Sequence, residues 1–121
     1  MGMSYLVDWN YNGIGDIILG HGYQIKTIEE VSLYLEGEYT SPDQLQISLL
    51  EGWNLIGYLR INPSNCTDVF NMISSEIILV KDYLGNAYLP DWDFNGIGDL
   101  EPGQGYQIKM NSNQILQYLP N

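Results

Sequence analysis

The chain has 121 residues, 45% of them hydrophobic, and a formal net charge of −11 with only four basic residues. Binding to nucleic acids or to anionic membranes needs clustered Lys and Arg side chains, so this composition argues against both. The length indicates a single domain, residues 1–121, that is large enough to bury a core.

The first element in chain order is a stretch that the chain carries twice. Residues 5–26, YLVDWNYNGIGDIILGHGYQIK, align without a gap on residues 88–109, YLPDWDFNGIGDLEPGQGYQIK, and 15 of the 22 positions are identical. Each copy predicts a strand, a loop with an Asn-Gly turn and a second strand, because its last five residues alternate between polar and apolar side chains. A further strand is expected at residues 31–35, which match residues 115–119.

Between the copies, the sequence predicts strands at residues 44–50, 53–61 and 76–83 and one short helix from about Ser64 to Ile73. The helix is indicated by an apolar stripe with helical spacing, and Ser64 or Thr67 is its expected cap. The stripe consists of Cys66, Val69, Phe70 and Ile73.

Frequent turns separate the expected strands, which indicates a mainly β (α+β) fold, an antiparallel barrel or sandwich with one short helix. Residues 46–119 read as a complete repeat unit, and residues 5–35 match only the second part of it. The chain therefore carries one and a half internal repeats. Because an unmatched half repeat has open strand edges, we expect a homo-oligomer, a dimer or higher, that forms by completion of the half repeat.

Both loops hold oxygen-bearing side chains at the spacing of a calcium loop. Positions 1, 3, 5 and 9 of this pattern, with Gly at position 6, are filled by Asp8, Asn10, Asn12 and Asp16 and by Asp91, Asp93, Asn95 and Asp99. Alternate side chains on a curled segment converge on one point, and calcium takes about six to eight oxygen ligands. The alternative interpretation is a solvated turn in which Asp and Asn bond to their own backbone.

The loop pattern is similar to the first part of an EF-hand loop and to the DxDxDGxxD calcium loops of thrombospondin type 3 repeats. It departs from the EF-hand at position 12, where Leu19 or Pro102 replaces the bidentate Glu. The second loop has three carboxylates and the first has two, so the second is expected to bind calcium more tightly. Any bound calcium is expected to be structural.

Aromatic side chains alternate with the acidic residues in the loops: Trp9 and Tyr11 in the first, Trp92 and Phe94 in the second. Exposed aromatic rings stack on sugar rings, which makes these four residues candidates for binding a small ligand or carbohydrate. The alternative is that the rings pack in the core or on the hairpins.

Catalysis finds little support in the sequence. Cys66 is the only cysteine and His21 the only histidine, and they lie far apart along the chain. We expect Cys66 to be a buried small side chain and His21 to occupy a polar surface position. A hydrolase that uses the loop carboxylates is the least favoured alternative.

Residues 52–58, followed by a short helix, and residues 91–109 carry a resemblance to a known group. The pattern GWNLIG…NGIGDLxPGQGYQIK resembles repeat modules of uncharacterised bacterial secreted, surface and phage-associated proteins. The resemblance covers most of the chain and implies a non-catalytic accessory β module in a secreted or surface protein. The chain itself has no signal peptide and no apolar run of membrane-spanning length, which predicts a soluble protein and leaves its compartment open.

Overall fold

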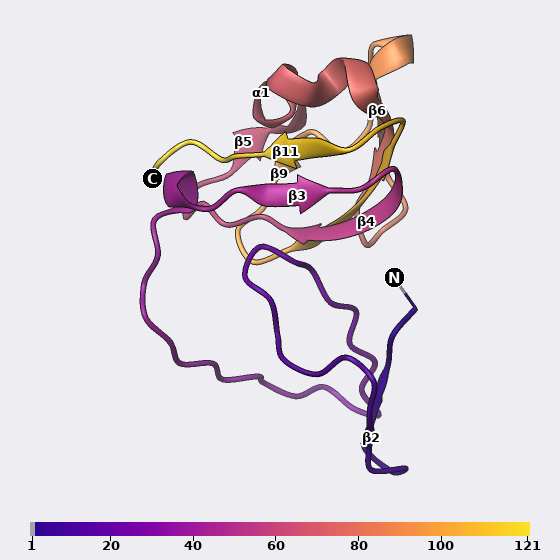
Figure 1. Ribbon diagram of the computed structural model, residues 1–121, viewed down its shortest axis with the longest axis vertical. Coiled ribbons are helices and arrows are strands. Elements are labelled where there is room, and N and C mark those ends of the chain that lie inside the picture. Colours follow the sequence, from indigo (N-terminus) through magenta and orange to yellow (C-terminus); the bar gives the residue numbers. More distant parts are fainter. Residues whose placement is uncertain (1) are drawn as a thin grey trace.

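The computed structural model describes residues 2–121 (Figure 1). Its main body is a five-stranded antiparallel sheet with the strand order β4-β10-β6-β7-β8. The strands are β4 (Gly52–Gly57), β6 (Ile77–Lys81), β7 (Ala87–Leu89), β8 (Phe94–Asn95) and β10 (Gly105–Met110). The strand that ends the second copy of the repeated stretch, β10, therefore lies inside the sheet.

Three two-stranded antiparallel sheets accompany this main sheet. They pair β1 (Tyr5–Leu6) with β2 (Tyr11–Asn12), β3 (Ile47–Leu49) with β11 (Gln114–Leu116), and β5 (Ser64–Asn65) with β9 (Asp99–Leu100). The mainly β, antiparallel prediction is confirmed, and of its two forms the closed barrel is not seen in residues 2–121.

The single α-helix, α1, spans Cys66–Val69 and is shorter than predicted. A 3-10 helix, η2 (Asn71–Glu76), continues it, because Phe70, with φ −97° and ψ 8°, leaves the α-helical region. The cap is Asn65, whose side chain accepts a hydrogen bond of 3.0 Å from the backbone N–H of Thr67, so the predicted caps were wrong. Two more 3-10 helices are η1 (Pro42–Gln44) and η3 (Pro90–Trp92).

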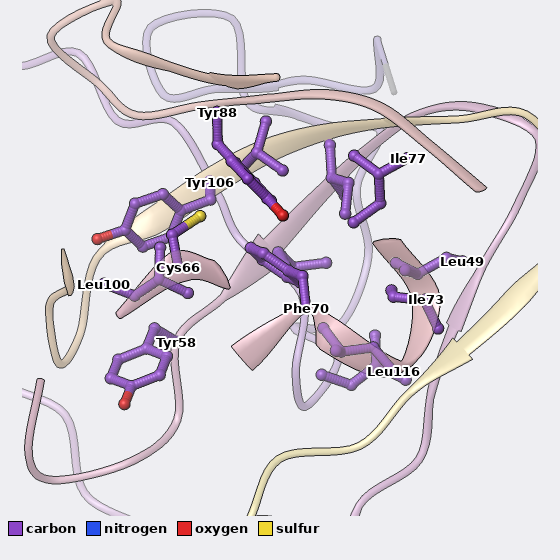
Figure 2. Packing of buried hydrophobic residues seen from close by; sticks show 14 of the residues in the cluster. Leu49, Tyr58, Cys66, Phe70, Ile73, Ile77, Tyr88, Leu100, Tyr106 and Leu116 are labelled. Atoms are coloured by element: carbon purple, nitrogen blue, oxygen red, sulfur yellow. The ribbon is translucent and has the colours of Figure 1, made fainter. Parts of the chain in front are cut away.

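One hydrophobic core lies between the main sheet, the β3–β11 pair and the α1–η2 segment (Figures 1 and 2). The predicted helical stripe is confirmed, since three of its members are buried and Val69 packs against the core. The Phe70 ring stacks on the Tyr88 ring at a centroid distance of 6.4 Å, which joins the helix to the second copy. The core consists of Ile47, Leu49, Ile56, Tyr58, Cys66, Phe70, Ile73, Ile77, Val80, Tyr88, Leu100, Tyr106, Ile108, Met110, Leu116 and Tyr118.

All of these core residues fall between residues 47 and 118. We call residues 46–81 the front half, residues 88–119 the second copy and residues 5–35 the first copy. The front half supplies both neighbours of β10, because β4 pairs with one edge of that strand and β6 with the other. The core is thus formed where the front half packs against the second copy.

The first copy lies below this body in Figure 1 and contains only the short strands β1 and β2. Strands predicted at residues 22–26 and 31–35 are not formed, although residues 22–26 are identical to the first five residues of β10. A strand needs a paired neighbour to satisfy its backbone, and within the described residues the first copy pairs with the main sheet only at the outer edge of β4, through a bridge between His21 and Ile56. Strand β1 has the predicted bounds, and β10 extends one residue beyond them. Strands β3, β4, β6 and β11 are shorter than those predicted at residues 44–50, 53–61, 76–83 and 115–119.

Candidate functional site

The two copies build the same turn from the same side chains. In the second copy, the Asn95 Oδ1 accepts hydrogen bonds from the backbone N–H groups of Ile97 and Gly98, at 3.2 and 2.9 Å. In the first copy, the Asn12 Oδ1 accepts two equivalent bonds, again at 3.2 and 2.9 Å. This is the Asx-type turn that the sequence offered as one interpretation of the loops.

The backbone of the two loops agrees as well. Position 3 of each loop is left-handed, with φ 48° at Asn10 and φ 50° at Asp93. Asn and Asp are the residues other than Gly that most readily accept this conformation. Tyr23 and Tyr106 occupy equivalent positions, and each hydroxyl accepts a bond from the backbone N–H five residues earlier, at 2.9 and 2.8 Å. The loop conformation is therefore determined locally and does not depend on what covers it.

What differs is the connection of each loop to the front half. The Asn95 side chain donates to the Oδ1 of Asn65 at 3.3 Å, and the Asn65 side chain donates to Asp99 at 3.5 Å. Asn65 also caps α1, so a single front-half residue holds both the helix and the second loop. Asn12, the counterpart of Asn95, bonds only within its own loop in the described chain.

The candidate calcium ligands lie at the surface in both loops, where Asn95 alone is partly buried. Within residues 2–121, no group of three or more His, Cys, Asp and Glu side chains is arranged to hold a metal ion. A groove of about 470 Å³ is lined by Asp99 together with Asp82 and Glu101, whereas Asp91 and Asp93 do not line it. Asn12, Asn95 and Asp99 lie in the short strands β2, β8 and β9 and Asp91 lies in η3, and calcium loading stays a prediction.

The loop aromatics divide into two kinds. A Cβ atom added at Gly13 would lie 2.7 Å from the Tyr11 hydroxyl, and one added at Gly96 would lie 3.0 Å from the Phe94 ring. Tyr11 and Phe94 therefore pack closely over the loop glycines. Trp9 and Trp92, in contrast, are 81% and 80% exposed, so their rings face solvent in both copies.

The clearest difference between the copies is the burial of matched apolar residues. Tyr5, Ile25 and Tyr34 are 58%, 68% and 83% exposed, and their counterparts Tyr88, Ile108 and Tyr118 are 5%, 0% and 3% exposed. Further large apolar residues of the first copy are also exposed: Leu6, Val7, Ile17, Ile18, Leu19, Ile28, Val31, Leu33 and Leu35. Monomeric proteins rarely expose so many neighbouring apolar side chains without a partner. We call this set, with Tyr5, Ile25 and Tyr34, the apolar surface of the first copy.

The backbone hydrogen bonds of the first copy also differ from those of the second copy. The backbone N–H of Gly22 donates to Leu55 at 2.9 Å and that of Gly57 donates to Gly20 at 3.0 Å, which attaches the first copy to β4. Beyond this attachment, residues 23–35 form no backbone–backbone hydrogen bonds within the described residues. A groove of about 600 Å³ is lined by residues 23–25 and, among others, by Leu55, Lys81 and Gln107 of the main sheet.

The sequence did not predict one cluster of side chains on the main sheet. Lys81 and Lys109 hold their Nζ atoms 5.9 and 5.6 Å from the ring of Trp53, a cation–π arrangement on the outer face of the sheet. Two of the four basic residues of the chain thus surround one tryptophan. The sequence shows that Trp53 and Lys109 each lie in an alternating strand. Only the pairing of β4 with β10 shows that Trp53 lies opposite Lys109.

Cys66 is fully buried in the core (Figure 2). Burial raises the pKa of its thiol to about 12, because the thiolate would lose its hydration there. A nucleophilic cysteine needs an accessible thiolate near neutral pH, and Cys66 offers neither accessibility nor charge.

No protein-family profile, curated protein or solved structure matches this chain. None of the helices in residues 2–121 is long and apolar enough to cross a membrane. The two copies within the chain therefore offer the comparison from which function is inferred.

Proposed function

We propose that this protein is a non-catalytic assembly module that docks on another polypeptide through the apolar surface of its first copy. The observation that carries the proposal is the burial of matched residues, which are covered in the second copy and exposed in the first although the two loops share one conformation. Covering one Ile or Leu side chain contributes roughly 1.5–3 kcal/mol. The homo-oligomer expected from the sequence is one form of this assembly.

The test is sedimentation velocity of the full chain over a wide concentration range, alone and with a candidate partner, together with hydrogen exchange of residues 5–35. Ile25→Asp should weaken any complex at least tenfold, because it places a charge on the apolar surface. Met72→Asp is the matched control, since Met72 is 92% exposed and lies outside the first copy. Equal effects of the two substitutions would contradict the proposal.

Calcium binding by the loops is a separate hypothesis. It rests on the duplicated ligand pattern, in which the Oδ1 atoms of Asn12 and Asn95 also accept hydrogen bonds from the loop backbone. Calorimetric titration of chelator-treated protein, with magnesium as the control, distinguishes the two interpretations. Saturable binding of one or two ions per chain would make calcium a structural component of the module, and no heat up to millimolar calcium would leave two Asx turns.

A second candidate function is the binding of a small ligand or carbohydrate, and the exposure of Trp9 and Trp92 favours it. Two solvent-facing indole rings in equivalent loops offer two stacking platforms. Tryptophan fluorescence of the chain and of Trp9→Ala and Trp92→Ala variants, titrated with a panel of oligosaccharides, tests this function. Trp53→Phe is the control, because Trp53 lies on the sheet and not in a loop.

A further inference from the structure

We infer that the partner of the first copy is a polypeptide of the front-half type: a strand, a short helix and a second strand with the apolar pattern of residues 46–81, supplied from outside residues 1–121. The inference rests on the proposed function and specifies its partner. It follows from the internal repeat, because the second copy shows what covers the equivalent surface.

The first step concerns the strand edges. In the second copy, β10 has β4 on one edge and β6 on the other, and both strands belong to the front half. Residues 22–26 have the same sequence as the first five residues of β10, yet residues 23–26 are unpaired within the described chain. A partner that satisfies this segment as β10 is satisfied must supply two strands, and the front half is the unit that does so.

The second step concerns the side chains. Ile108 is covered in the core that Phe70 and Ile77 of the front half help to form, and Ile25 has no such cover. Tyr118 donates a hydrogen bond of 2.7 Å to the carbonyl of Gly57 and meets the Tyr58 ring edge-on at 5.4 Å. Its counterpart Tyr34 needs the same two groups, a strand carbonyl and an aromatic ring, at the equivalent place.

Residues 1–121 contain fewer front halves than copies that need one. Each chain has one front half and two copies of its complement, and its own front half is already packed against the second copy. If two chains exchanged front halves, every first copy that gained a cover would leave a second copy uncovered. A second molecule of residues 1–121 therefore does not complete the first copy by front-half pairing, and the missing front half must come from a polypeptide segment outside them.

The fourth step is charge. Residues 1–45 contain seven acidic residues and one basic residue, a net charge of −6, whereas residues 46–81 contain three acidic and two basic residues, a net charge of −1. Packing two first copies against each other would bring together two strongly acidic segments, which costs free energy. A nearly neutral front half avoids this repulsion.

The experiment uses the full chain and, as the probe, a labelled synthetic peptide of residues 46–85 under reducing conditions. We expect saturable 1:1 binding by fluorescence anisotropy and slower hydrogen exchange of residues 22–35. Ile25→Asp in the chain should weaken binding at least tenfold, and Met72→Asp should leave it unchanged. A peptide with Ile56→Asp and Ile77→Asp is the matched control probe and should not bind.

Three outcomes would overturn the inference. If the peptide does not bind but the chain self-associates in a way that Ile25→Asp abolishes, the front-half partner is wrong and the proposed assembly function stands. If the peptide protects only residues 105–119, it has replaced the chain's own front half and does not recognise the first copy. If the peptide does not bind and the first copy exchanges freely at every concentration of the chain, both the inference and the proposed function are wrong.

Discussion

The first copy and the second copy are related sequences, identical at 15 of the 22 aligned positions, in two environments. Both form an Asx turn with a left-handed residue at position 3, and both use a tyrosine hydroxyl to hold the loop. Only the second copy has a front half, and only there do the residues that follow the loop become a strand with a buried face. Local sequence therefore determines the turn, whereas neighbours determine the strand.

The largest expected effect compares Ile108 with Ile25. Ile108→Ala removes a fully buried side chain and leaves a cavity, which should lower the free energy of unfolding by about 2–5 kcal/mol. Ile25→Ala changes an exposed side chain and should alter it by less than about 0.5 kcal/mol. Urea denaturation of the two variants measures the difference, and similar losses would mean that the first copy is covered in solution.

Alkaline pH should lower the free energy of unfolding through the thiol and phenol groups that are buried in the core. Burial raises the pKa of the Cys66 thiol from 9.0 to about 12, and it also raises the pKa of Tyr88, Tyr106 and Tyr118. The unfolded chain loses these protons at lower pH than the folded chain, so stability is fully present below about pH 9 and falls as the pH rises towards 12. Between these two pH values Cys66 contributes a slope of about 1.4 kcal/mol per pH unit.

Urea denaturation between pH 7 and pH 11 measures this loss of stability. Cys66→Ala removes the titrating thiol, so the free energy of unfolding should fall less steeply between pH 9 and pH 11. A decline of unchanged slope in Cys66→Ala would assign the effect to the tyrosines alone. Tyr34→Phe in the first copy serves as the control, since that ring is outside the core.

The smallest expected effect compares the two turn asparagines. Asn95→Ala removes the Asx turn and the bond to Asn65, and should lower the free energy of unfolding by about 1–2 kcal/mol. Asn12→Ala removes only the local turn and should leave global unfolding nearly unchanged, while hydrogen exchange at residues 13–15 accelerates. Equal global effects would show that the first loop is also tied to the core.

Sequence reasoning succeeded where the cause of a structure lies within a few residues. The helical stripe of Cys66, Phe70 and Ile73 and the turns at Asn12 and Asn95 depend on spacing and on local hydrogen bonds, and both interpretations could be stated from the sequence. The strand at residues 22–26 was predicted from the same alternation as β10 and is not formed, because alternation describes a face and does not supply a neighbour.

Other features required the pairing register. Asn65 follows Ser64 in a polar run, and nothing local distinguishes it as the residue that caps α1 and also holds Asn95 and Asp99. The cluster of Trp53 with two lysines likewise depends on which strands lie side by side. For the loops, the sequence identified the asparagines that form the Asx turns, and the calcium occupancy of the loop oxygens is a question for titration.

The attachment of the first copy to β4 also covers part of one edge of the main sheet. β4 is an edge strand of the main sheet, and unpaired edges template the pairing of other chains and aggregation. At one end of this edge, Gly20 and Gly22 occupy the backbone groups of Gly57 and Leu55. At the other end, the Asn54 side chain turns back to the carbonyls of Leu50 and Gly52, at 2.8 and 3.2 Å. A partner that draws residues 20–22 away from β4 would open this edge, so engagement of the first copy and protection from aggregation are linked through two hydrogen bonds.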